Sequence, residues 1–155
     1  MVLDFFASWC GPCKVAIQEE LAPLWSQHYE DNSNVVFLSI DIGEKEITSQ
    51  ELKNFADAYN IGWPVLMGSG TSAADKYGVK AVPTLVIVGP EGKIREKHVG
   101  SPSSSALREK INDLTEGDLP TGTEGEEVSF PITWTILAIC LGILAIGGTV
   151  YWQKK

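Results

Sequence analysis

Residues 4–14 read DFFASWCGPCK, and this stretch decides the fold because it brings two cysteines to the junction of a predicted strand and a predicted helix. The run VLDFFA (2–7) is short, apolar and rich in aromatic residues, which predicts a buried strand. The segment 13–30 spaces its apolar residues with a helical period, which predicts a helix that Pro23 is expected to kink. The two cysteines therefore lie where a strand passes into a helix.

Cys10 and Cys13 are expected to differ in reactivity because of their places in this helix. Cys10 would lie at or just before the first helical residue, and Pro12 suits the first turn. Unpaired backbone N–H groups and the positive end of the helix dipole favour a thiolate at Cys10. Cys13 follows about one turn later, close enough to attack a mixed disulfide formed by Cys10. The spacing suits an exposed nucleophile and a recessed resolving thiol.

Three other interpretations of this CxxC pair compete with a redox-active dithiol. A zinc site needs four ligands, but the sequence holds no second CxxC, and His28 and His98 are isolated. A purely structural disulfide would close so small a ring that it would restrict the unfolded chain little. A peroxiredoxin would carry the frame Pro-x-x-x-Thr-x-x-Cys, where this chain has Leu3 and Ala7. A redox-active dithiol is the favoured interpretation, and no metal is predicted.

The remainder of residues 1–116 alternates between strand and helix patterns. Thr48 and Glu51 have the spacing of a capping box at the start of a helix, and Gly78 is placed to close another. The order of elements predicts an α/β domain whose central mixed sheet is flanked by helices. After the first strand and helix, strands are predicted over 34–42 and twice within 84–100 around the turn Pro90-Glu91-Gly92, and helices over 48–60, 71–78 and 101–114.

Residues 1–116 resemble the thioredoxin superfamily. Trp-Cys-Gly-Pro-Cys within DFFASWCGPCK is a specific signature of its active site, and AVPTLVIV (81–88) is similar to the family's loop in which a cis-proline faces the dithiol. The resemblance implies a thioredoxin-like fold in which Cys10 is the nucleophile, Cys13 resolves, and the two form a redox disulfide. It also implies that the Val82–Pro83 bond is cis.

The same resemblance implies supporting roles for residues around the dithiol. Asp4 matches the buried acid that assists proton transfer at the second cysteine. Trp9 would shield the site and flank the substrate groove, and Pro83 would shape that groove. Gly11 and Pro12 form the dipeptide between the cysteines, which resembles reducing thioredoxins more than strong oxidants. No bound cofactor is implied.

Within the superfamily, the chain is most similar to TlpA-like, membrane-attached thiol-disulfide proteins that act outside the cytoplasm. The likeness lies in the additional helical stretch of residues 39–79 and in its segment WPVLMG (63–68). Two features depart from that pattern. The apolar segment of this chain is C-terminal rather than N-terminal, and Asp4 stands where those proteins often carry a non-acidic residue.

The last 39 residues differ in composition from the rest. Residues 117–130 hold four acidic and no basic side chains with several Gly and Pro, which predicts a flexible linker. Residues 131–152 carry no charge over 22 positions, enough for a helix to cross a hydrocarbon core of about 30 Å. Trp134 and Trp152 would lie at its two interfaces. We expect a single transmembrane helix in the lipid bilayer, with Cys140 as a small apolar residue inside it.

The short basic tail, residues 153–155, predicts the orientation of this helix. Lys154 and Lys155 follow the apolar segment directly, so the positive-inside tendency places the C-terminus in the cytoplasm and residues 1–116 outside it. The start MVLDFF has no signal-peptide pattern. In the resembled family a further strand and helix precede the CxxC strand, so we expect a missing N-terminal segment and an uncovered sheet edge.

These observations predict a membrane-anchored enzyme that reduces protein disulfides. Its partners would be protein dithiols or disulfides, and a membrane or soluble dithiol would supply its electrons. A disulfide-forming or isomerising enzyme on the same scaffold, and a non-catalytic module that only captures thiols, are the alternatives. The net charge of −8 argues against nucleic-acid binding.

Overall fold

The computed structural model describes residues 1–43, 47–69 and 71–116, which include the whole of the predicted redox site. Within these ranges no helix is both long and apolar enough to cross a membrane. The predicted linker (117–130), transmembrane helix (131–152, with Cys140) and basic tail (153–155) lie outside the described residues.

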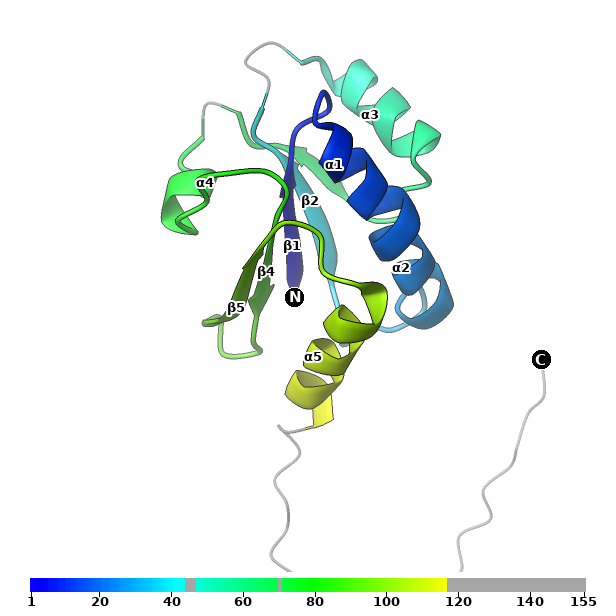
Figure 1. The fold of residues 1–155 in the computed structure, drawn as a ribbon, viewed down its shortest axis with the longest axis vertical. Coiled ribbons are helices and arrows are strands. Elements are labelled where there is room, and N and C mark those ends of the chain that lie inside the picture. The colour runs from blue at the N-terminus through cyan, green and yellow to red at the C-terminus, as the bar shows by residue number, and fades with distance from the viewer. Residues whose placement is uncertain (44–46, 70, 117–155) are drawn as a thin grey trace, which may run out of the picture. The chain divides into compact units, whose positions relative to one another are not determined.

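A five-stranded mixed sheet forms the centre of the domain, in the order β3-β2-β1-β4-β5 (Figure 1). Strand β1 lies in the middle, parallel to β2 on one side and antiparallel to β4 on the other. Strand β3 pairs in parallel with β2, and β5 pairs antiparallel with β4. The predicted mixed sheet is confirmed. The strands are β1 (Val2–Phe6), β2 (Phe37–Asp41), β3 (Val65–Met67), β4 (Thr84–Val88) and β5 (Ile94–Val99).

Strand β3 was not predicted, and β2 is shorter than expected. Only three residues form β3, and they have the burial pattern of a half-exposed edge. A segment this short has no periodicity of its own, so its pairing with β2 decides that it is a strand. The predicted strand 34–42 begins only at Phe37, because β2 begins where its pairing with β1 begins, at Val2 opposite Phe37.

One continuous helical run follows the dithiol, from Gly11 to His28 (Figure 1). It consists of α1 (Gly11–Val15), a π-helical segment η1 (Ala16–Leu21) and α2 (Ala22–His28). The N–H of Ala22 donates to the carbonyl of Ile17, five residues back. Pro23 follows directly and has no N–H to donate. The helix therefore continues past the proline because the turn before it is a wider π-helical turn, a feature that the sequence pattern did not predict.

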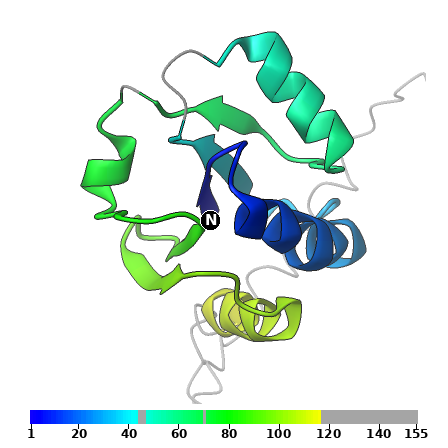
Figure 2. The ribbon, with the colours of Figure 1, turned by 45° about the horizontal axis from the view of Figure 1, so that its top comes forward.

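The two faces of the sheet carry separate apolar cores, as alternating side chains of a strand require. Figure 2 shows that helices cover both faces. The larger core lies under the α1–α2 helix, α3 (Ser49–Ala58) and α5 (Ser104–Glu116). The smaller core lies under the short helix α4 (Ala73–Lys76). The larger core includes both cysteines of the site. The strand residues of the larger core are Val2, Phe6, Phe37, Leu85 and Ile87. Those of the smaller core are Leu3, Phe5, Ile40, Val86 and Val88.

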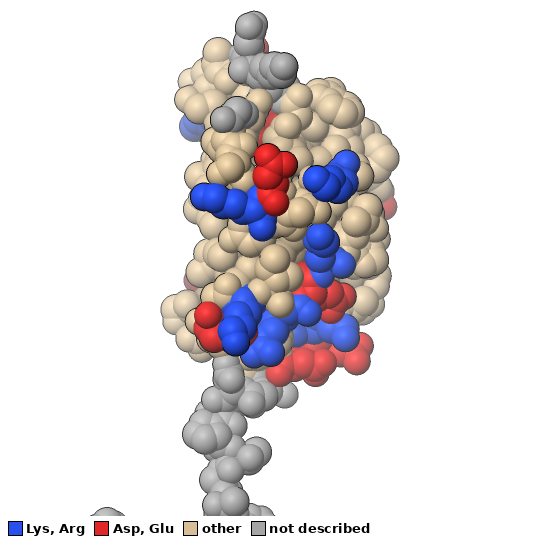
Figure 3. Space-filling model, turned by 90° about the vertical axis from the view of Figure 1, so that its left-hand side faces the viewer, with Lys and Arg blue, Asp and Glu red and all other residues tan. Residues whose placement is uncertain are grey.

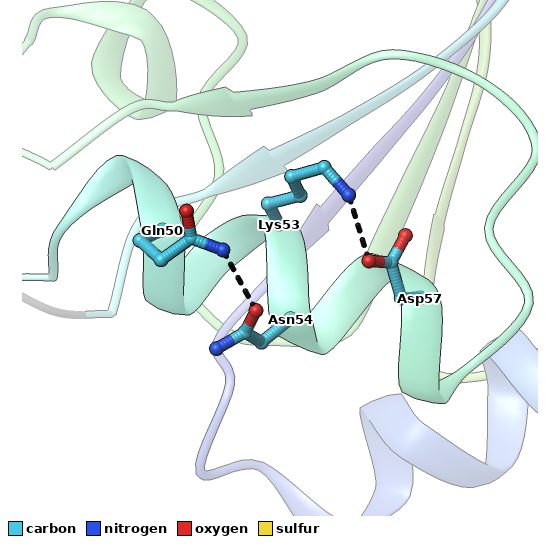
Figure 4. Close-up of polar contacts among 4 residues, drawn as sticks. All are labelled: Gln50, Lys53, Asn54 and Asp57. Carbon is cyan, nitrogen blue, oxygen red and sulfur yellow. Dashed lines mark hydrogen bonds and ion pairs between the residues drawn. The ribbon is translucent and has the colours of Figure 1, made fainter.

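Helix α3 begins with the predicted capping box. The Thr48 hydroxyl accepts from the Glu51 N–H at 3.2 Å, and the Glu51 carboxylate accepts from the Thr48 N–H at 2.9 Å. The outer side of the helix carries two polar pairs four residues apart, Gln50 with Asn54 and Lys53 with Asp57 (Figure 4). One side of α3 is thus solvated, and the other packs on the larger core through Leu52 and Phe55.

Two predicted turn positions are confirmed, whereas α4 and α5 cover other residues than the predicted ranges 71–78 and 101–114. Gly78 follows α4 with a φ of 61°, and Gly92 has a φ of 77° in the turn between β4 and β5, a backbone region that favours glycine. Strand β5 is largely exposed at the other sheet edge. Figure 3 views the side of α4 and β5 and shows basic and acidic side chains next to one another. Arg95 in β5 forms an ion pair with Glu91 at 2.7 Å.

Replacing Thr48 by Ala should lower the free energy of unfolding by about 1 kcal/mol, because the first turn of α3 loses its side-chain acceptor. Thermal or urea unfolding followed by circular dichroism measures the change. Ser49→Ala is the matched control, since Ser49 is the next residue and makes no capping bond. Equal losses in both variants would contradict the capping role of Thr48.

Candidate active site

The two cysteines form a disulfide at the beginning of α1, with their Cα atoms 5.2 Å apart. Cys10 is the N-cap residue, in an extended conformation (φ −75°, ψ 109°), and Gly11 and Pro12 are the first helical residues. The Cys13 N–H donates to Cys10 Sγ at 3.2 Å. The local sequence explains this geometry, because Pro12 needs no N–H partner in a first turn and Cys10 supplies a side-chain acceptor.

The sequence predicted an exposed Cys10 and a recessed Cys13, but both cysteines are buried in the larger core. Cys10 is 4% exposed and Cys13 1%, so the little accessible surface of the disulfide belongs mainly to Cys10. Trp9, directly before it, is 65% exposed. Cys10 Sγ also lies at the positive end of the α1 dipole and accepts a backbone N–H, which stabilises negative charge on sulfur. The arrangement suits attack at Cys10 and resolution by Cys13.

Pro83 directly precedes β4 and lies at the end of the sheet where β1 leads into the dithiol. The Val82–Pro83 peptide bond is cis, as the resemblance implied, and Pro83 is buried. Because β4 runs antiparallel to β1, the start of β4 lies beside the end of β1. Val82 packs against the apolar cluster that contains both cysteines. The loop is held by a hydrogen bond from the Thr84 hydroxyl to the Ala81 carbonyl at 2.7 Å.

Asp4 is a buried carboxylate in the middle of β1. Its side chain lies on the face of Val2 and Phe6, which is the face covered by the α1–α2 helix and the cysteines. Asp4 Oδ2 accepts from the Ser39 hydroxyl at 2.9 Å, and Ser39 Oγ accepts from the Trp63 indole N–H at 2.9 Å. Burial raises the pKa of Asp4 from 3.8 to about 7, against the lowering effect of the Ser39 hydrogen bond.

Three further residues lie in this neighbourhood that no sequence pattern singled out: Ser39, Trp63 and Gly43. Ser39 interrupts the apolar run of β2, and this polar position inside a predicted buried strand was the available signal. Trp63 reaches the site only because the chain returns to the sheet beside β2. A Cβ on Gly43 would overlap the side chain of Ala7 and lie 3.0 Å from Trp9 Nε1, so a glycine is required behind Trp9.

The two histidines lie apart on different elements. His28 ends α2, with its Nε2 3.2 Å from Arg108 Nη1, and His98 lies in β5. Within the described ranges, no three His, Cys, Asp or Glu side chains gather closely enough to hold a metal ion.

Residues 1–97 match the model of the AhpC/TSA family. The chain belongs to this family. At the first cysteine, this AhpC/TSA family member has Leu3 and Ala7 where the peroxiredoxin frame has proline and threonine. Its fold and its similarity to a protein named as thioredoxin-like confirm the resemblance to the thioredoxin superfamily.

The family member is similar to several thiol-disulfide proteins. Thiol-disulfide oxidoreductase ResA of Bacillus subtilis (strain 168) is 26% identical over 118 residues, which are 75% of this chain and 62% of that protein. Thioredoxin-like protein YneN of the same organism is 30% identical over 114 residues, 72% of this chain and 63% of that protein. The chain thus spans less than two thirds of the length of these relatives.

Among solved structures, the family member is similar to a thiol-disulfide oxidoreductase from Bacteroides fragilis NCTC 9343. The two chains are 28% identical with a TM-score of 0.58, and the match covers 73% of this chain and 79% of the other.

Gly43→Ala should lower the free energy of unfolding by about 1–3 kcal/mol, because the new methyl group must displace Ala7 or Trp9. Gly11→Ala is the matched control. A Cβ at Gly11 meets no atom within 4 Å, and alanine in a helix should stabilise by about 0.5–1 kcal/mol. Urea unfolding of the oxidised protein measures both, and effects of the same sign would contradict the close contact at Gly43.

Stability should fall as pH rises between 3.8 and about 7, because in this window native Asp4 holds its proton while the unfolded chain has released it. The full difference corresponds to about 4 kcal/mol. Asp4→Asn should remove this decline, whereas Asp113→Asn, at an exposed position, should keep it. Urea midpoints of the oxidised protein from pH 4 to 8 measure the effect, and parallel curves for wild type and Asp4→Asn would refute it.

Proposed function

We propose that this chain is a thiol-disulfide oxidoreductase that reduces protein disulfides through Cys10 and Cys13. The observation that carries the proposal is the disulfide at a helix N-terminus, in which the nearly covered Cys13 directs its N–H to the sulfur of Cys10. The names of the relatives support the same reaction class.

The reaction begins with the reduced dithiol. The Cys10 thiolate attacks one sulfur of a substrate disulfide, which forms a mixed disulfide and releases the other substrate sulfur as a thiolate. Cys13, as a thiolate, then attacks Cys10 Sγ, so the Cys10–Cys13 bond forms and the bond to the substrate breaks. The substrate leaves with two more electrons and takes up two protons. Cys10 and Cys13 lose those two electrons.

The neighbouring residues have distinct roles in this scheme. Asp4 accepts the Cys13 proton, for which a carboxyl pKa near 7 is suitable at neutral pH. Exposed Trp9 flanks the bound peptide, and Pro83 shapes the groove beside the dithiol. Gly11 and Pro12 shape the first turn between the two sulfurs. The reaction uses these side chains alone and requires no bound cofactor.

The proposed direction and place of the reaction are supported by the wider sequence. The Gly11-Pro12 dipeptide favours a reductase, and a measured reduction potential would separate it from a disulfide-forming enzyme. Residues 131–152 would anchor the chain in a membrane with the dithiol domain outside the cytoplasm. A membrane or soluble dithiol protein would return Cys10–Cys13 to the reduced state.

The 155-residue chain should catalyse the reduction of insulin by dithiothreitol, and Cys10→Ser should abolish the catalysis, because only Cys10 begins the exchange. Turbidity of the precipitating insulin chains measures the rate. Cys140→Ser is the control that removes a cysteine but leaves the dithiol, and it should keep the wild-type rate.

Cys13→Ser tests the alternative of a non-catalytic capture module. This variant should accumulate a mixed disulfide between Cys10 and substrate, visible by non-reducing electrophoresis, and should lose turnover. Full turnover without Cys13, or none in folded wild type, would overturn the proposed reductase.

A further inference from the structure

A chain of two hydrogen bonds connects Asp4 to a residue far from it in sequence. The Trp63 indole N–H donates to Ser39 Oγ at 2.9 Å, and the Ser39 hydroxyl donates to Asp4 Oδ2 at 2.9 Å. All three side chains are buried, Ser39 completely. Asp4 and Ser39 lie directly opposite one another in the β1–β2 register, so the sheet itself determines their separation.

The chemistry of the side chains determines which group donates in each of the two hydrogen bonds. An indole N–H can only donate, so Ser39 Oγ must accept from Trp63. A hydroxyl has one hydrogen, and the short distance to Asp4 Oδ2 directs it there. Turning the hydroxyl away would leave buried polar groups unpaired, which is costly in an apolar environment. Asp4 Oδ2 is therefore held as an acceptor whether Asp4 is charged or neutral.

We propose that Ser39 and Trp63 are positioning residues that keep Asp4 Oδ2 occupied as an acceptor, so that Oδ1 is the oxygen that takes up and releases the proton during dithiol exchange. The inference rests on the proposed function for the exchange step, but the hydrogen-bond chain can be tested without it. Within the described residues, Oδ2 carries the hydrogen bond of Asp4 to another side chain.

The proton transfer balances without any further reactant. The Asp4 carboxylate takes the proton of the Cys13 thiol at Oδ1, leaving a Cys13 thiolate and a neutral carboxyl group. When Cys13 Sγ bonds to Cys10 Sγ, the substrate sulfur leaves as a thiolate and is protonated, and Asp4 returns its proton to solvent or substrate. Ser39 keeps its own proton throughout.

Other titratable groups near Asp4 are few. Asp41, two residues after Ser39 on β2, shares this face of the sheet by strand alternation, and Cys10 and Cys13 belong to the α1 helix that covers it. The other residues of the larger core come from the α1–α2 helix, α3, β4 and α5 and their flanks, and they include two phenols, Tyr29 and Tyr59, which ionise far above neutral pH in the free amino acid. Any measurement must therefore separate Asp4 from Asp41.

Site-resolved titration of the oxidised 155-residue chain tests the proposal. Carboxyl ¹³C NMR reports each aspartate, and loss of one signal in Asp4→Asn assigns Asp4. Ser39→Ala should raise the proton affinity of Asp4 by about tenfold, since the charged form loses its donor. Trp63→Phe should raise it by less, because Ser39 remains but its hydroxyl is no longer directed.

The double variant decides whether Trp63 acts through Ser39. In the Ser39→Ala background, Trp63→Phe should add no further change in Asp4 titration. Trp25→Phe is the matched control: its ring lies 5.7 Å from that of Trp63, but it is not part of the hydrogen-bond chain, so it should leave the titration unchanged. An additive effect in the double variant, or an unchanged Asp4 in folded Ser39→Ala, would overturn the proposal.

The pH dependence of the rate of insulin reduction tests whether the Trp63–Ser39–Asp4 hydrogen bonds affect the reaction. Ser39→Ala should move the rise of the profile to higher pH by the same amount as the NMR titration, and Asp4→Asn should remove that rise. A pH profile that does not follow the Asp4 titration would overturn the role of Oδ1. If wild type does not reduce insulin at all, the proposed function fails, while the NMR titration still decides the roles of Ser39 and Trp63.

Discussion

The complete burial of strand β1 between β2 and β4 is the constraint on which the rest of the structure depends. All five of its residues are buried, so each side chain must find a partner on one of the two faces. Val2 and Phe6 enter the larger core, and Leu3 and Phe5 the smaller. The chain leaves this strand directly into the dithiol. The same packing that stabilises the sheet therefore determines where the cysteines lie.

The burial of Asp4 in the same strand has an energetic cost. A carboxylate removed from water raises its own pKa unless hydrogen bonds stabilise its charge. One hydroxyl, from Ser39, partly offsets that cost, and the pKa remains near neutrality. A strand with an apolar residue at this position would be more stable above neutral pH. Asp4 thus makes the fold less stable than an apolar residue would at this position, and such a cost is typical of residues that transfer protons.

The dithiol depends on a second constraint, which is the unbroken helix behind it. A helix that ended near Pro23 would uncover the core around Leu21 and Leu24, which holds Cys13 in place. The π-helical segment allows the run to continue to His28, and the carboxylate of Glu20 within it accepts from the backbone N–H of Ser104 at the start of α5. The irregular segment thus connects the active-site helix to α5.

The sequence by itself determined the dithiol, its place at the start of a helix and the capped start of α3, because each depends on residues close together in the chain. The order of strand and helix patterns predicted the mixed sheet, and the resemblance to the thioredoxin superfamily implied the cis-proline loop. Only the tertiary structure decided that Val65–Met67 is a strand, that the helix passes Pro23 through a π turn, and that Ser39 and Trp63 reach Asp4. Those features depend on contacts between distant segments. Their individual residues carry no periodic or motif signal, and only the folded sheet brings them together.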